Sequence, residues 1–147
     1  MQADPPAYRF KVSLRLVHPA VELSGCSAEF GLEPFRHCTV GEPRTTPRGD
    51  PLDGVWGDSY WTAPLEIGAD EDLEKALARI GYWLGEHHAF MTNHVSSGGS
   101  AELFIGFFLE SFNGGFLLEP ALLAKFSALG VALGIDIYGS DDEPVAL

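Results

Sequence analysis

The segment from Tyr8 to Leu16 alternates strictly between apolar and polar residues, and this pattern limits the possible folds of the chain more than any other. The apolar set is Tyr8, Phe10, Val12, Leu14 and Leu16, and the polar set is Arg9, Lys11, Ser13 and Arg15. Successive side chains of a β-strand point to opposite faces, so the pattern predicts a strand with one buried and one accessible face. The chain should therefore contain a sheet that is covered on one side.

The region after this strand predicts a short helix and a hairpin. Pro19 and Gly31 are typical of a helix start and a helix end, although the Ser24-Gly25 pair favours a start only at Ser24. The stretch 41–58 is rich in Gly and Pro and predicts a long loop. The segments 35–40 and 55–62 predict the strands on either side of it, joined as a hairpin.

The second half of the chain predicts two further helices and two further strands. An amphipathic pattern from Leu73 to Met91 predicts one long helix, with the acids of residues 70–72 in its first turn. Residues 101–110 are almost all apolar and predict a central strand covered on both faces. The third helix is expected at 120–129, with its buried side formed by Leu122, Leu123, Phe126 and Leu129. Alternation over 131–137 predicts the last strand.

The predicted order β-α-β-β-α-β-α-β indicates an α+β fold, a two-layer sandwich. Its sheet should be mixed and mostly antiparallel, with the helices packed on one face. The length of 147 residues and the hydrophobic content of 46% predict a single domain with its core at about 8–138. We expect the short acidic C-terminal tail to be disordered. Two cysteines and no signal-peptide pattern favour the cytoplasm.

The charge of the chain is large and unevenly distributed. Nine basic and 21 acidic residues give a net charge of −12, which disfavours nucleic acid and anionic membranes as partners. Residues 1–48 hold six of the basic residues and only five acids. The protein should be electrically polarised if the fold separates these residues from the acidic remainder.

No motif in the sequence predicts a catalytic centre or a cofactor. His87 and His94 are seven residues apart, about 10 Å along a helix, which is too far to share one metal ion. His37 and Cys38 are neighbours in a predicted strand and should face opposite sides, which leaves no thiol–imidazole pair. The glycine pairs lack the context of a phosphate-binding loop. We therefore expect no metal and no cofactor, and the catalytic residues, if any, remain unknown.

The side of the sheet without helices is the best candidate for a ligand site or an interface. The residues expected there are Arg9, Lys11, Arg15, Phe104, Phe108 and Tyr138. Basic and aromatic side chains together suit an anionic ligand, a protein partner or a second copy of the chain. Alternatively, the 41–58 loop covers this face together with Trp56 and Trp61, for which we expect a structural role.

Several glycine, proline and tryptophan positions resemble a known family. They are Gly31-Leu32-Glu33-Pro34, Gly41-Glu42, Trp56, Trp61 and the final Leu133-Gly134-Ile135-Asp136-Ile137-Tyr138. Over about residues 8–138 the chain resembles the bacterial family called domain of unknown function 4279. The resemblance implies a stand-alone bacterial domain of the cytoplasm with no established activity and no catalytic residues to carry over. We also expect structural roles for Gly31 and Pro34.

Two classes of function follow from these observations. The first is a non-enzymatic binding module for a protein partner or a small ligand, which could form a homodimer. Some small acidic proteins of this type resemble immunity partners of secreted toxins, so an immunity-like role is one version of this class. The alternative is a small-molecule enzyme whose site is assembled from dispersed residues on the open sheet face.

The histidine spacing leads to a first prediction about metals. Because no closed metal site is expected and the core is apolar, EDTA should leave the melting temperature unchanged. Differential scanning calorimetry of protein purified without chelator checks this, and a drop of several degrees on adding EDTA would contradict it.

Overall fold

The computed structural model describes residues 7–140 of the chain, so most of the predicted acidic C-terminal tail lies outside the described residues. The elements are β1 (Tyr8–His18), α1 (Gly25–Phe30), β2 (Arg36–Cys38), β3 (Pro43–Thr45), β4 (Pro51–Val55), β5 (Ser59–Leu65), α2 (Leu73–Glu86), α3 (His88–Ser96), β6 (Ser100–Leu109), α4 (Pro120–Ala128) and β7 (Val131–Tyr138). Within this range no helix has the length and apolar character needed to cross a lipid bilayer.

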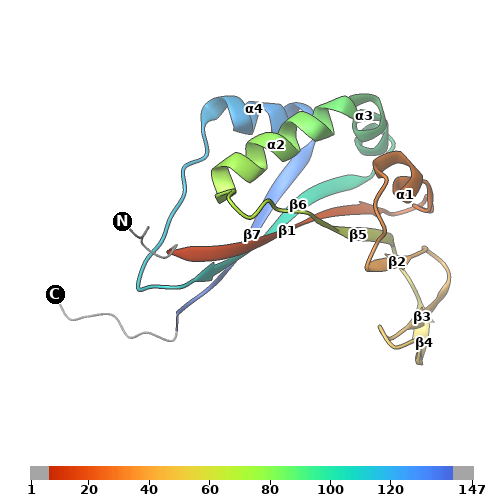
Figure 1. Cartoon of the computed structure of the whole chain (residues 1–147). Helices are drawn as coiled ribbons and strands as arrows, with labels where there is room; N and C mark the ends of the chain where they lie inside the picture. Colours follow the sequence, from red (N-terminus) through yellow and green to blue (C-terminus); the bar gives the residue numbers. More distant parts are fainter. Residues whose placement is uncertain (1–6, 141–147) are drawn as a thin grey trace, which may run out of the picture.

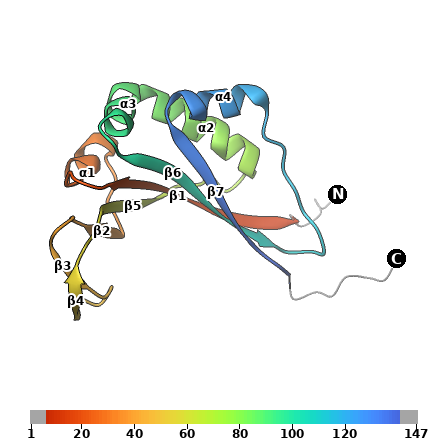
Figure 2. The ribbon, with the colours of Figure 1, turned by 180° about the vertical axis from the view of Figure 1, so that it is seen from behind.

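The main sheet has five strands in the order β2-β5-β1-β6-β7. The central strand β1 runs antiparallel to both β5 and β6, and β7 runs parallel to β6. The helices lie on one face of this sheet, and the separate β3–β4 hairpin projects on the other side (Figures 1 and 2). The predicted α+β sandwich with a mixed sheet is confirmed.

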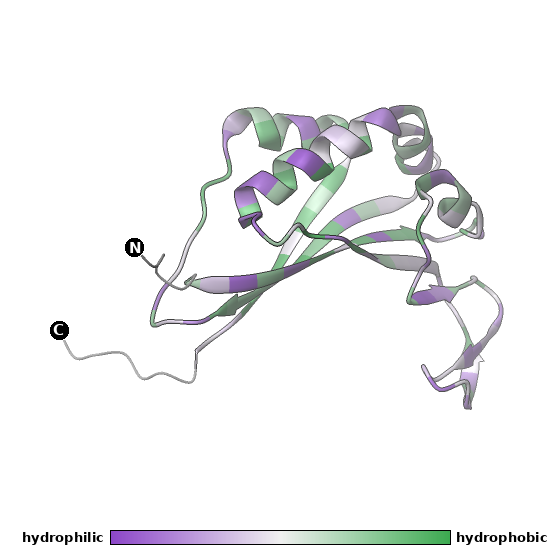
Figure 3. Ribbon diagram, in the orientation of Figure 1, coloured by the Kyte–Doolittle hydropathy of each residue, from purple (hydrophilic) through white to green (hydrophobic). Residues whose placement is uncertain are grey.

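The core lies between the helices and the helix-facing side of the sheet. Leu14 of β1, Trp61 of β5, Leu77 of α2 and Leu103 of β6 are fully buried there. Bands of hydrophilic and hydrophobic residues follow one another along α2, as expected for a helix with one buried stripe (Figure 3). The alternation in β1 thus fixes which face of the sheet receives the helices.

The helix α4 supplies the crossover that two parallel strands require. Pro120 stands at the start of α4, and Gly130 beyond its end has φ +72°, a conformation that glycine adopts without strain. Phe126 and Leu129 are buried as predicted. Leu123 is 44% exposed, so its predicted place on the buried side was wrong.

The structure confirms one predicted helix start and corrects two other expectations. The first helix begins after Ser24, as the Ser24-Gly25 pair indicated, and not at Pro19. The long amphipathic helix is divided at His87, whose φ of −103° and ψ of 25° interrupt the helical backbone between α2 and α3. The strand β6 was predicted to be covered on both faces, but helices cover only one of them. Its outward side chains, such as Phe104, lie on the helix-free side of the sheet.

The predicted 41–58 loop is largely structured, which corrects another expectation. It contains the antiparallel β3–β4 hairpin, in which Pro43 pairs with Val55 and Thr45 with Pro51. Gly49 and Gly54 have positive φ angles and allow the sharp changes of direction. The sequence did not predict this hairpin, because neither of its exposed strands alternates between apolar and polar residues. The predicted pairing of the flanking strands is confirmed by β2 and β5.

The two predicted structural tryptophans differ in environment, and this leads to a second prediction. Trp61 is fully buried and donates from Nε1 to Ser27 Oγ at 2.9 Å, so Trp61→Ala should reduce the free energy of unfolding by about 3–5 kcal/mol. Trp56 is half-buried at the base of the hairpin, and Trp56→Ala should cost about 1 kcal/mol. Urea unfolding checks both values, and equal losses would contradict these environments.

Candidate binding face of the sheet

The helix-free side of the main sheet is formed by every second residue of its strands. We call this surface the open face. Its members are Arg36 and Cys38 of β2, Tyr60, Thr62 and Pro64 of β5, Arg9, Lys11, Ser13, Arg15 and Val17 of β1, Ser100, Glu102, Phe104, Gly106 and Phe108 of β6, and Ala132, Gly134, Asp136 and Tyr138 of β7. All six residues predicted for a ligand site or interface therefore share one surface.

Arg15 and Phe104 form the tightest contact on the open face. The guanidinium carbon of Arg15 lies 3.7 Å from the centre of the Phe104 ring. The same guanidinium lies 3.5 Å from Glu102 Oε1, so one cation is held by a ring and a carboxylate at once. Arg15 and Phe104 are both half-buried, and their planar groups are fixed before any ligand arrives.

A second cluster lies on the same face at the other end of β6. The rings of Phe108 and Tyr138 stack with centres 4.8 Å apart and an angle of 9° between planes. The Arg9 guanidinium carbon lies 5.7 Å from the Phe108 ring centre, and Arg9 also pairs with Glu110. Phe104 and Phe108 are thus partly covered by side chains of their own chain.

A third cluster, at the base of the hairpin, was not predicted from the sequence. The guanidinium of Arg36 lies 5.6 Å from the Trp56 ring centre and 5.4 Å from the Tyr60 ring centre. Trp56 also lies 5.6 Å from the guanidinium of Arg44. The sequence signal was available in principle, because pairing β2 with β5 places Arg36 beside Thr62 and hence on the open face.

Arg15 and Arg36 flank Thr62 and border a hollow of about 300 Å³. Tyr60, Ser100 and Glu102 also line it. Two guanidinium groups beside hydroxyl groups suit a carboxylate or another oxyanion, because arginine binds such groups through two parallel N–H donors.

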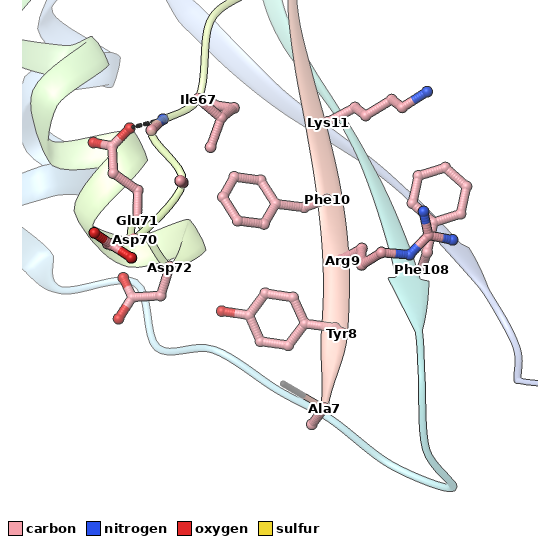
Figure 4. A pocket seen from close by; sticks show the side chains of 12 residues that line it. Ala7, Tyr8, Arg9, Phe10, Lys11, Ile67, Asp70, Glu71, Asp72 and Phe108 are labelled. Carbon is pink, nitrogen blue, oxygen red and sulfur yellow. Dashed lines mark hydrogen bonds between the residues drawn. The ribbon is translucent and has the colours of Figure 1, made fainter. Parts of the chain in front are cut away.

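A larger pocket, of about 590 Å³, lies at the edge of the open face (Figure 4). Tyr8 and Phe10 project into it from β1, and Ile67 faces them from the segment that leads to α2. Arg9, Lys11 and Phe108 border the pocket on the side of the open face. The pocket therefore combines an apolar interior with a basic border on the side of the open face and an acidic wall formed by Asp70, Glu71 and Asp72.

The open face has a basic excess within an acidic protein. It carries four basic side chains, Arg9, Lys11, Arg15 and Arg36, against the acidic Glu102 and Asp136 and, just beyond β6, Glu110, which pairs with Arg9. The segment 66–74, which leads into α2 on the helix side, holds five acids. The predicted electrical polarisation therefore has a structural counterpart, with basic groups on the open face.

The glycines on this face are covered by neighbouring side chains. A Cβ at Gly106 would lie 3.2 Å from the Phe108 ring, and one at Gly134 would lie 2.9 Å from the Glu102 carboxyl carbon. These glycines leave room for side chains of the protein itself rather than an approach for a ligand. Gly31 ends α1 with φ +63°, which agrees with its predicted structural role, and Pro34 is half-buried after it.

The two cysteines do not form a reactive centre. Burial, together with the smaller effect of the negative charge of Glu22, raises the pKa of Cys26 to about 12, so the thiol stays protonated. Burial also raises the pKa of Cys38. In the described part of the chain neither cysteine is placed as a thiolate nucleophile.

Two of the histidines, His87 and His18, hold parts of the fold together. His87 Nδ1 pairs with Glu29 Oε1 at 3.0 Å and links α2 to α1. His18 is buried and accepts at Nδ1 from the backbone N–H groups of Ala20 and Val21. Within residues 7–140 no three His, Cys, Asp or Glu side chains gather in a way that could hold a metal ion.

His94 is buried beside His18 and bound to the chain through its ring. Its ring lies 5.7 Å from that of His18, and its Nε2 donates to the Ser100 carbonyl at 2.9 Å. Burial lowers the pKa of His94 and the neighbouring His18 lowers it further, against the raising effect of the carbonyl contacts. Gly99 makes room for the ring, since a Cβ there would lie 2.4 Å from it.

The lowered pKa of His94 gives a third prediction. The unfolded chain binds this proton more readily than the folded one, so stability is complete above the ordinary pKa of 6.5 and falls as the pH drops below it. His94→Gln should flatten this fall. Urea unfolding between pH 7.5 and pH 5 checks it, and equal slopes for the two proteins would contradict the assignment.

Comparison with known proteins places the whole described region in one family. The model of the family described as a domain of unknown function (DUF4279) matches residues 7–140. No curated protein and no solved structure matches the chain. Since the family model covers nearly the entire sequence, the resemblance seen in the glycine, proline and tryptophan positions is confirmed, and the chain belongs to the DUF4279 family.

Proposed function

We propose that this protein is a non-enzymatic binding module whose open face docks onto an acidic surface of a protein partner. The observation that carries the proposal is the set of arginine–aromatic contacts across this face. Arg15 lies over Phe104, Arg9 over Phe108, and Arg36 beside Tyr60. Arginine and aromatic residues are the side chains most enriched at protein interfaces and at their energetic centres.

The charge of the open face supports an acidic partner. The net charge of −12 repels acidic proteins at long range, so only a locally basic surface can receive one. Lys11 forms no ion pair with any residue between 7 and 140, and Arg15 is paired only with the half-exposed Glu102. Lys11 therefore remains fully available to carboxylates of a partner, whereas Arg15 shares its charge with Glu102. An immunity-like role would be one case of such a complex.

A homodimer through the same face has less support. A twofold-symmetric dimer places the same patch of both copies in contact, so the basic groups of one copy would lie near those of the other. Both copies also carry the full net charge. The face therefore suits an acidic partner better than itself.

The alternative of a small-molecule enzyme also has less support. The hollow between Arg15 and Arg36 contains one carboxylate, Glu102, and Arg15 already neutralises it. A general base needs a group with a suitable pKa within hydrogen-bond reach of a substrate proton. The hollow suits binding of a carboxylate better than catalysis.

The fourth prediction tests the open face by charge reversal. Arg15→Glu and the double variant Phe104→Glu with Phe108→Glu should each weaken partner binding about 30-fold or more, equivalent to about 2 kcal/mol. The partner is isolated from an extract of the producing cells on immobilised wild-type protein. Its affinity for each purified variant is then measured by isothermal titration calorimetry.

Lys75→Glu on the exposed side of α2 is the matched control. It changes the net charge by the same amount as Arg15→Glu but leaves the open face intact, so it should bind like the wild type. Circular dichroism melting verifies that each variant folds. Equal weakening by Lys75→Glu, or unchanged partner binding by the open-face variants, would contradict the proposal. A homodimer in analytical ultracentrifugation that the open-face variants disrupt and Lys75→Glu does not would also contradict it.

A further inference from the structure

The first four residues of β1 lack a strand neighbour on one side. On the other side Tyr8 pairs with Leu109 and Lys11 with Gly106 of β6. The pairing with β5 begins only at Val12, opposite Leu65. Beyond Leu65 the chain leaves the sheet through residues 66–72 and enters α2, and the pocket of about 590 Å³ lies in the gap (Figure 4).

The hydrogen-bond phase shows which backbone groups face this gap. In an antiparallel ladder, residues that bond to one neighbour alternate with residues that bond to the other. The carbonyl of Ala7 accepts from Glu110 N, so the odd-numbered residues of β1 bond to β6. The N–H and C=O groups of Tyr8 and Phe10 therefore point into the gap.

The bonds on the far side of the sheet confirm this phase. The carbonyl of Thr62 accepts from Phe35 N, so even-numbered residues of β5 face β2 and Leu65 faces β1. Leu65 pairs with Val12, an even-numbered residue of β1. No backbone contact outside the strand ladders involves Tyr8 or Phe10 within residues 7–140. The two backbone N–H groups and two C=O groups of Tyr8 and Phe10 are thus left without a backbone partner in this part of the chain, in the geometry that a further antiparallel strand would bond to.

The gap is held open by contacts of the segment opposite β1. Glu71 accepts from Gly68 N at 2.8 Å and from Arg79 at 2.7 and 2.8 Å. Arg79 also donates to the carbonyl of Glu66 at 2.8 Å. Asp72 caps α2 by accepting from Lys75 N. These bonds brace residues 66–72 against α2. Tyr8 Oη accepts from Leu73 N at 3.3 Å, so the Tyr8 side chain reaches across the gap to the start of α2 while its backbone groups toward the gap stay unpaired among the described residues.

We propose that the edge formed by Tyr8 and Phe10 accepts an extended segment of a protein partner as an additional antiparallel strand. Strand addition to a sheet edge uses main-chain bonds for affinity and alternate side chains for specificity. This site is distinct from the clusters around Arg15 and Arg36, because it requires none of the side chains of Arg15, Arg36 or Phe104. It shares Arg9 with the cluster around Phe108.

The surroundings of the edge define the chemistry of the segment. Residues that pair opposite Tyr8 and Phe10 point to the same side as these rings, toward Ile67, and must be apolar. Asp70 and Asp72 on that wall disfavour an acidic residue there. Intervening residues point toward Arg9 and Lys11 and should be acidic. The expected segment alternates apolar and acidic residues.

A second copy of the same chain fits this edge less well. If Tyr8 of each copy paired with Phe10 of the other, Arg9 would lie directly opposite Arg9. Like charges opposite one another in a ladder are destabilising. The charge pattern therefore favours a segment of another protein, and a dimer formed through this edge would overturn the proposal.

The probe for the test is an eight-residue peptide of alternating valine and glutamate, acetylated and amidated. It is titrated into the isotope-labelled full chain, and amide resonances are followed by NMR. The Tyr8 and Phe10 amide signals should move downfield and exchange more slowly with solvent. No shift of these two signals at about 2 mM peptide would overturn the proposal.

Backbone methylation of the peptide provides a control that leaves the protein unchanged. The valines pair opposite Tyr8 and Phe10, so their N–H groups bond to β1, whereas those of the glutamates point away. Methylation of the valine nitrogens should weaken binding about tenfold or more, and methylation of the glutamate nitrogens should weaken it much less. Equal effects would show that no strand forms.

Two matched protein variants complete the test. Phe10→Pro and Phe10→Val both remove the aromatic ring. Proline also removes the backbone N–H of residue 10, which faces the gap and not β6, whereas valine keeps this donor. Binding should be about tenfold weaker for Phe10→Pro than for Phe10→Val. Phe104→Glu should leave peptide binding unchanged, since it acts on the open face. Loss of binding in Phe104→Glu would place the peptide on that face and overturn strand addition, whatever the fate of the proposed function.

Discussion

The structure depends on the burial of one side of β1. This strand is central, and its helix-facing residues Val12, Leu14 and Leu16 are buried against the helices while its neighbours β5 and β6 continue the same surface. A shift of β1 by one residue would turn Arg9, Lys11 and Arg15 into the core. The hydrophobic effect on one face therefore fixes the basic character of the other.

This constraint links the fold to the proposed binding. The helices protect one face of the sheet, and the other face presents planar cations held by rings, as in the contact of Arg15 with Phe104. Groups ordered before binding lose less conformational entropy when a partner arrives. The same sheet ends unevenly, because β5 is shorter than β1 on one side, and the unpaired edge at Tyr8 and Phe10 results. Both proposed sites follow from the placement of β1.

The sequence predicted what depends on local periodicity. The alternation of β1 and β7, the amphipathic stripe of α2 and the helix end at Gly31 were all found. The β3–β4 hairpin was missed because its exposed strands lack alternation, and the break at His87 was missed because the apolar stripe continues through it. The position of Arg36 follows from the predicted pairing of β2 with β5, but the edge pocket depends on the residue at which β5 begins to pair with β1, which no local pattern shows. The six predicted residues of the open face share one surface, and their role in binding stays a prediction.

The most direct measurement is the protection of arginine side chains in the isolated complex. Labelling with a dicarbonyl reagent, read by mass spectrometry, compares the free protein with the protein bound to its partner. We expect Arg9, Arg15 and Arg36 to be protected by the partner, while Arg79 of α2 reacts equally in both states. Protection of Arg79 with unchanged labelling of Arg15 and Arg36 would contradict the account, because the partner would then bind on the helix side.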